Sequence, residues 1–215
     1  MKYNILDTKQ KIFNVGKQLF YEKGYANTKI SDICKKLEIT KGAFYHYYSN
    51  KLELGAKVYF YFASNNEKII DLFHGQIDGI IAQCLETKLF WYLFFHDENI
   101  RRFSTDTSKE NIIEMRDHSF ILNLYSRLNK SPAEMELDYI SIANIGIIRQ
   151  ITVDLYAHID QYNYDEISDY YLKTLFKLLE MDVPYIENIL LRTKNLFLQC
   201  SIANDYFDVT CQLKQ

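Results

Sequence analysis

The sequence is poor in the residues that make turns, with 7 glycines and 2 prolines among 215 residues. Folds rich in β-sheet need turn residues about every eight to twelve positions, so this scarcity argues against a sandwich or a barrel. Long helices joined by few turns are favoured instead. With 25% charged and 48% hydrophobic residues, the composition is that of a globular protein and not of a disordered chain.

Long apolar runs and paired cysteines are also missing. The longest unbroken apolar run, Leu89 to Phe95, is far shorter than the roughly 18 residues of a membrane span. The segment from Met1 to Asp7 has no apolar stretch typical of a secretory signal. The four cysteines lie far apart, which favours reduced thiols. We therefore expect a cytoplasmic protein without a membrane partner.

Motifs for catalysis or metal binding are absent from the sequence. It contains no glycine-rich phosphate loop, no nucleophile elbow and no Cys–His signature of a nucleophilic enzyme. The histidines beyond the first fifty residues have no second ligand at a suitable spacing: His74, His96, His118 and His158. We predict a protein that is not an enzyme and needs no metal or cofactor.

The net charge of −3 conceals an asymmetry between the two ends of the chain. Residues 1–57 contain eleven lysines, no arginine and five acidic residues, an excess of six positive charges. The remaining residues therefore carry an excess of nine negative charges. A basic end on an acidic body indicates that this end meets a polyanion such as nucleic acid, although a lysine-rich solvated face would have the same composition.

Helical spacing and capping residues divide the basic end into short helices. Apolar residues recur at helical intervals over residues 5–23, and Gly24 suits the left-handed position after a helix. Thr28 is predicted to cap a second helix, and Thr40 a third that ends near Tyr47. Asn50 is predicted to cap a fourth helix that continues to about Phe73.

The rest of the chain is predicted to be helical as well. Further helices are expected near residues 77–95, 108–129, 132–159, 165–181 and 184–207, with a polar break at residues 104–108. The predicted fold is therefore all-α, with a three-helix domain at residues 1–50 and a larger helical bundle at residues 51–215. The long helix of residues 50–73 would connect the two.

The second and third helices have the form of a helix-turn-helix. A recognition helix needs slim or polar side chains at its N-terminus, where it enters the major groove. Residues of this kind occur here in sequence: Thr40, Lys41, Gly42, Ala43, Tyr45 and His46. Helix N-termini also attract phosphate, which makes Thr28, Lys29 and Lys51 candidate backbone contacts. Each of these side chains could instead pack in the core or be an ordinary surface residue.

The order of these residues resembles a known family. The segments at residues 12–25, 28–33, 40–48 and 51–54 resemble the tetracycline-repressor (TetR) family of bacterial transcription regulators. The resemblance implies a helical homodimer with an N-terminal DNA-binding domain, and a C-terminal domain that dimerises and binds an effector. It assigns phosphate contacts to Thr28, Lys29 and Lys51, the turn into the recognition helix to residues 40–42, and the DNA-facing positions to Tyr45 and His46.

The sequence also departs from this family pattern. Ala43 stands where a hydroxyl residue is common, and Tyr48 replaces the usual phenylalanine. Since arginine is absent from this end, bidentate readout of guanine by arginine is unavailable, and lysine, backbone and DNA shape must provide more of the discrimination.

The acidic part of the chain is rich in aromatic residues. An aromatic-lined cavity would suit a flat or apolar ligand, and the best candidates for its lining are Trp91, Phe95 and Phe120. The same residues could form an ordinary helical core. Dimerisation is expected through the helices of residues 132–181, and the last helix could cap that bundle or extend its interface.

We therefore predict a ligand-responsive transcription regulator that binds a palindromic operator as a homodimer. The resemblance implies a repressor, the commonest kind in the family. The alternative from another class is a helical scaffold or co-regulator that acts through protein partners and binds DNA with little selectivity. The missing arginines and Ala43 leave this alternative open.

Overall fold

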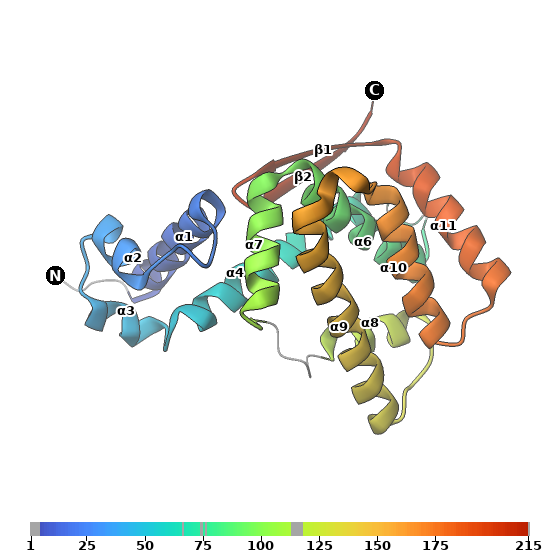
Figure 1. Cartoon of the computed structure of the whole chain (residues 1–215), viewed down its shortest axis with the longest axis horizontal. Coiled ribbons are helices and arrows are strands. Elements are labelled where there is room, and N and C mark those ends of the chain that lie inside the picture. Colours follow the sequence, from blue (N-terminus) through green and yellow to red (C-terminus); the bar gives the residue numbers. More distant parts are fainter. Residues whose placement is uncertain (1–4, 66, 74, 76, 113–117, 215) are drawn as a thin grey trace.

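The computed structural model describes residues 5–65, 67–73, 75, 77–112 and 118–214 (Figure 1). We call the first three helices the head and everything from α4 onward the body. The head consists of α1 (Ile5–Lys23), α2 (Ile30–Leu37) and α3 (Lys41–Tyr47). The body begins with α4 (Lys51–Asn65), which leads from the head into the rest of the molecule (Figure 1).

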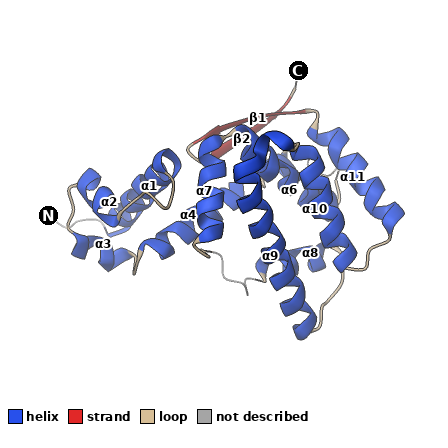
Figure 2. Cartoon of the chain, viewed as in Figure 1, coloured by secondary structure: helices blue, strands red, loops and turns tan. Residues whose placement is uncertain are grey.

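The body is a layered bundle of helices with one small sheet (Figure 2). Among the described residues, its further helices are α5 (Lys68–Asp71), α6 (Gly79–His96), α7 (Glu98–Lys109), α8 (Ser119–Arg127), α9 (Glu134–His158), α10 (Tyr164–Leu178) and α11 (Val183–Phe197), and a 3-10 turn covers Ile159–Gln161. Strands β1 (Cys200–Asp205) and β2 (Asp208–Leu213) form an antiparallel hairpin. The predicted all-α fold class is confirmed, with this hairpin as an addition.

Helix α6 is the centre of the body because nearly every side of it is buried. Its side chains from Ile80 to Leu89 are almost all buried, and α10, α11, α7 and α8 pack around it. The fully buried Lys88 is held by Asp165 and Asp169 of α10, and Lys194 of α11 also contacts Asp165. This network connects three helices through charges that are paired rather than left isolated in the interior.

The head forms from the local signals that the sequence contains. Gly24 has a φ of +83°, the left-handed conformation expected after α1. The Thr40 hydroxyl accepts a hydrogen bond from the Ala43 amide at 3.1 Å, and the Asn50 side chain accepts one from the Glu53 amide at 2.8 Å. Both predicted caps are confirmed. The prediction that Thr28 caps α2 is wrong, because Lys29 occupies that position and Thr28 is fully buried.

The predicted long helix of residues 50–73 is wrong, because α4 ends at Asn65 and α5 covers only Lys68–Asp71. The side chains of Ser64 and Asn65 both donate to the Tyr61 carbonyl oxygen, at 2.9 and 2.8 Å. Such local side-chain bonds offer the backbone an alternative to continued helix.

The polar segment of residues 104–108 was expected to be a break but lies inside α7. Asp97 caps this helix by accepting from the amides of Asn99 and Ile100. The hydroxyls of Thr105 and Thr107 donate to carbonyls one turn earlier, those of Arg101 and Ser104, so polar residues are satisfied within the helix. Of the expected helix 108–129, residues 113–117 lie outside the described residues and α8 covers Ser119–Arg127.

The prediction of a last helix over residues 184–207 is wrong beyond Phe197, where α11 ends. The chain there turns into the hairpin, in which burial alternates along β1 with Cys200 inside and Ser201 outside. Alternation with a period of two is the signature of a strand on a half-buried surface. The hairpin runs back from α11 along the body, and its turn lies beside the head (Figure 1).

Candidate nucleic-acid interface and ligand cavity

Helix α3 presents a compact surface because its inner side is fixed by aromatic packing. Phe44 is fully buried, and its ring lies 5.9 Å from that of Tyr48. The opposite side of the helix then faces solvent, with Lys41, Gly42 and His46 exposed and Tyr45 52% exposed. Thr40 is exposed at the cap and Ala43 is half-buried. These six residues form one surface, which we call the α3 surface.

The two aromatic residues of the α3 surface are braced from behind. The Tyr45 ring meets the Phe44 ring edge-on at 5.6 Å, and the His46 ring meets that of Tyr47 at 4.9 Å. Each of these exposed rings thus contacts one aromatic neighbour on the same helix. A short helix with a slim N-terminus and polar side chains on its exposed face has the geometry of a helix that enters a major groove.

Thr28 and Lys29 differ in what they can offer to a ligand. The Thr28 hydroxyl donates to the carbonyls of Gly24 and Leu19, at 2.8 and 3.2 Å, so it holds the end of α1 to the start of α2. The Lys29 amide donates to Asp32 at 3.0 Å, while its side chain is exposed. Of the two side chains, only that of Lys29 lies at the surface.

Lys51 is half-buried at the start of α4 and is engaged within the protein. Its ammonium donates to the Tyr25 carbonyl at 3.0 Å and lies 4.1 Å from the centre of the Tyr25 ring. Burial lowers the pKa of the Lys51 ammonium, and the nearby Glu110 and Asp106 carboxylates oppose that shift. Lys51 thus ties α4 to the loop between α1 and α2.

The body contains a cavity of about 520 Å³ between α4, α6, α7, α8 and α9. Six aromatic rings line it: Tyr59, Phe60, Phe90, Trp91, Phe120 and Tyr171. A cavity of this size with mostly apolar walls is typical of small-molecule sites. The predicted Trp91 and Phe120 belong to it, but the predicted Phe95 does not, since its ring packs against the neighbouring cluster of Trp91, Phe94 and Leu155.

Several buried polar groups on the cavity wall have no hydrogen-bond partner among the described residues. They are Gln83 Oε1 and Trp91 Nε1 of α6 and Ser104 Oγ of α7. Leaving a buried donor or acceptor unpaired costs about 1–3 kcal/mol, so native proteins rarely do so without a reason. Sequence reasoning missed Gln83 and Ser104, because no pattern in the sequence tells which polar residue of a buried helix stays unpaired.

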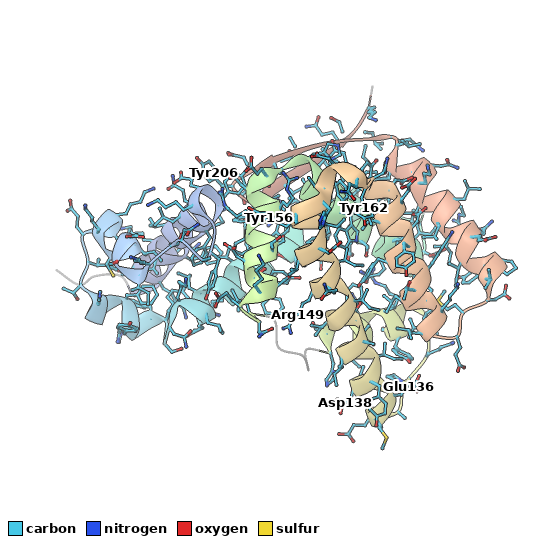
Figure 3. The ribbon with its side chains drawn as sticks, in the orientation of Figure 1. Glu136, Asp138, Arg149, Tyr156, Tyr162 and Tyr206 are labelled. Atoms are coloured by element: carbon cyan, nitrogen blue, oxygen red, sulfur yellow. The ribbon has the colours of Figure 1, made fainter. Side chains whose placement is uncertain are left out.

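Charged groups also reach the cavity. Glu86 accepts a hydrogen bond from Arg127 at 3.1 Å, and burial raises the pKa of its carboxyl although Arg127 opposes the shift. Arg149 of α9, labelled in Figure 3, also lines the cavity, and burial lowers the pKa of its guanidinium. The Tyr171 hydroxyl donates to Asn144 at 2.5 Å on the same wall. The cavity can therefore contact both the apolar part of a ligand and its polar substituents.

In the part of the chain that the structure describes, no group of three or more His, Cys, Asp and Glu side chains is arranged to hold a metal ion. His74 lies outside the described residues. None of the helices described has the length and apolar character needed to cross a bilayer.

Comparison with known proteins places the head in a family. The sequence pattern of a family described as bacterial regulatory proteins, tetR family, matches residues 12–58. An uncharacterized HTH-type transcriptional regulator of Lactococcus lactis is 45% identical over 51 residues, which is 24% of this chain and 26% of that protein. The TetC protein of transposon Tn10 from Escherichia coli is 43% identical over 56 residues, 26% of this chain and 28% of that protein. The chain thus matches about a quarter of the length of these curated relatives.

The remainder of the chain is matched by structure. The crystal structure of RolR in complex with resorcinol aligns with a TM-score of 0.61, covering 87% of this chain and 95% of that one at 14% identity. At this identity the likeness shows a shared fold. Residues 12–58 thus match the tetR family of bacterial regulatory proteins, and the described chain shares its fold with RolR.

Proposed function

We propose that this protein is a ligand-responsive transcription regulator that binds double-stranded DNA as a homodimer and acts as a repressor. The observation that carries the proposal is the α3 surface, an exposed, capped and braced helix within the segment that matches the family. Lys41, Tyr45 and His46 would meet base edges or phosphates, and Lys29 and Lys51 would meet the DNA backbone. Thr28 would act by holding α2 in place.

A dimer is needed because one short recognition helix reads too few base pairs to be selective. Support comes from α9, whose exposed side carries apolar residues at spacings of four and three: Met135, Tyr139 and Ile142, followed by Gly146. A Cβ at Gly146 would meet no atom within 4 Å, so the helix is open to a close neighbour there. Tyr170 and Leu178 of α10 are exposed as well.

The cavity would hold the effector. Its six rings favour a flat and largely apolar molecule, and the unpartnered Trp91 Nε1 and Gln83 Oε1 favour one with both an acceptor and a donor. RolR, which shares the fold, was crystallised with resorcinol. A ligand that reaches these atoms would supply the hydrogen bonds that the protein leaves unmade.

Helix α7 offers a direct route from this cavity to the head. Ser104, Thr107 and Ser108 face the cavity. On other sides of the same helix, Arg102 donates to the carbonyls of Tyr21 and Glu22 at 2.9 and 2.8 Å, and Asp106 accepts from the Ala26 amide at 2.9 Å. A ligand that favours another position of α7 would shift the head, and a coupling of about 1–3 kcal/mol lowers operator affinity about five- to 150-fold.

Gel-shift titration of the DNA flanking the gene tests this proposal. The intact protein should bind one fragment selectively, and Tyr45→Ala should weaken that binding. Tyr185→Ala is the matched control, since Tyr185 is 48% exposed on α11 of the body. Binding to no fragment, or equal binding to all, would favour the alternative of a protein-binding scaffold.

Ligand binding is tested separately by the fluorescence of Trp91, the single tryptophan of the chain. Flat aromatic compounds with donor and acceptor groups should quench or shift its emission and release the operator. A compound that binds at Trp91 without changing operator affinity would contradict the regulatory role of the cavity.

A further inference from the structure

The C-terminal hairpin reaches from α11 to the junction of head and body. Its two strands pair from Cys200–Leu213 to Asp205–Asp208, which leaves Tyr206 and Phe207 as a two-residue turn. Figure 3 shows Tyr206 beside the end of the head. The turn therefore touches elements that are far away in sequence.

The backbone of this turn is strained. Tyr206 and Phe207 have φ values of +48° and +68°, the left-handed region that bulky residues avoid. Two-residue turns with positive φ at both positions usually contain Asn-Gly or a similar pair. Strained backbone persists where the surroundings dictate it, and it clusters at functional positions. The contacts made by these two side chains must account for the conformation.

Phe207 packs where three elements meet. It is fully buried, and its ring lies 5.2 Å from Tyr21 of α1, 5.5 Å from Phe62 of α4 and 4.7 Å from Phe103 of α7. Tyr206 covers the outer side of Tyr21 at 5.0 Å. One side chain from the end of the chain thus contacts the head, the connecting helix and the helix that lines the cavity.

Polar contacts surround this ring. The Asp208 carboxylate accepts from Lys17 of α1 at 2.8 Å and from the Tyr61 hydroxyl of α4. Asn204 donates to Asp97 at 2.9 Å, and Asp97 also accepts from the Tyr21 hydroxyl at 2.7 Å. Charge, hydroxyl and ring contacts therefore converge on the same face of α1.

We infer that the hairpin turn is a positioning element that fixes the orientation of the head relative to the body, with Phe207 and Asp208 as its positioning residues. In a dimer, that orientation sets the distance between the two α3 surfaces. The hairpin then determines which separation of operator half-sites, about 34 Å or a multiple, is preferred. This consequence for DNA rests on the proposed function, whereas the positioning itself does not.

The Ala26 amide is a direct reporter of head position. Ala26 is exposed in the loop after α1, and its amide donates across the junction to Asp106 of α7 at 2.9 Å. Hydrogen exchange at this amide, measured by NMR on the full chain, follows the opening of the junction. Amides inside α2, such as that of Ile33, report whether the head itself stays folded.

Phe207→Gly removes the ring and suits the positive φ, so the turn keeps its backbone conformation. We expect exchange at Ala26 to become at least about tenfold faster while exchange at Ile33 is unchanged. Asp208→Asn removes the charge that faces Lys17 with little change in shape, and should accelerate exchange at Ala26 about two- to fivefold. Asp208→Glu should restore part of the protection.

Thr210→Ala, at an exposed position of β2, is the control and should leave Ala26 unaffected. Unchanged exchange at Ala26 in both Phe207→Gly and Asp208→Asn would overturn the inference, whatever DNA binding does. If Phe207→Gly unfolds the protein, exchange at Ala26 in Asp208→Asn alone tests the inference.

A second measurement tests the consequence for DNA with operators whose half-site separation is varied. A merely destabilised protein would lose affinity for all separations equally, whereas a repositioned head changes their ranking. We expect Asp208→Asn to reduce the ratio between the best and the next separation about two- to fivefold. If exchange at Ala26 becomes faster but the ranking of half-site separations is unchanged, the hairpin positions the head without affecting operator choice. If the unmodified protein does not bind DNA at all, the proposed function is contradicted instead.

Discussion

The head and the body bury their polar groups in different ways. In the head, the fully buried Thr28 hydroxyl donates to two carbonyls, those of Leu19 and Gly24. On the cavity wall of the body, polar atoms of Gln83, Trp91 and Ser104 are buried without a partner among the described residues. The buried Thr28 hydroxyl of the head is thus satisfied within the head, whereas these buried polar atoms of the body are not.

The largest predicted effect on stability tests whether the head and the body unfold independently. Phe44→Ala removes a fully buried ring from the small core of the head and should destabilise it by about 3–5 kcal/mol. Helical circular dichroism should show the head unfolding at lower temperature, while the fluorescence of Trp91 in the body keeps its transition. Transitions that shift together in both signals would show that head and body unfold as one unit.

A smaller loss of stability is expected from Thr28→Val. Valine has nearly the shape of threonine but has no hydroxyl proton to share between the Gly24 and Leu19 carbonyls, so that buried hydrogen bond is lost. The free energy of unfolding of the head should fall by about 1–3 kcal/mol. Urea denaturation followed by circular dichroism measures it, and an unchanged midpoint would remove Thr28 from the contacts that stabilise the head.

At the cavity, a substitution is expected to raise the stability of the protein instead of lowering it. Ser104→Ala removes a buried hydroxyl that has no partner, so without ligand the body should gain about 0.5–2 kcal/mol. Unfolding followed by Trp91 fluorescence measures this gain, and Thr28→Val serves as the matched case of a partnered hydroxyl. A destabilised Ser104→Ala variant would mean that its hydroxyl is satisfied in solution, and the contrast between the two regions would weaken.

The same contrast governs what could be predicted from the sequence. The head depends on local signals, and Gly24, Thr40 and Asn50 act where the sequence placed them. Its one misassigned cap, Thr28, is buried by the neighbouring end of α1, which no local pattern reveals. The helix-turn-helix was predicted from charge, spacing and capping, and its DNA-facing positions from the family resemblance.

The body depends on contacts between distant segments, and there prediction was less complete. Residues 104–108 of α7 were predicted to be a polar break because they are rich in serine and threonine. In the structure Thr105 and Thr107 are buried and donate to earlier carbonyls of the same helix, which the sequence pattern does not reveal. The hairpin lacks the glycine that marks such turns and owes its shape to rings on α1, α4 and α7. Aromatic density identified Trp91 and Phe120 as cavity residues, but the rotation of α6, which turns Phe95 elsewhere, is set by packing.

The smallest predicted effect concerns Lys51, the first residue of α4 in the body, which contacts Tyr25 of the head. If its ammonium also neutralises a phosphate, Lys51→Ala should weaken binding to all DNA sequences alike and lower the slope of log affinity against log salt by about one unit. Lys57→Ala, at an exposed lysine six residues along the same helix, is the control. Weaker binding with an unchanged slope would assign Lys51 a purely structural role through the Tyr25 carbonyl, since losing an internal hydrogen bond releases no counterions.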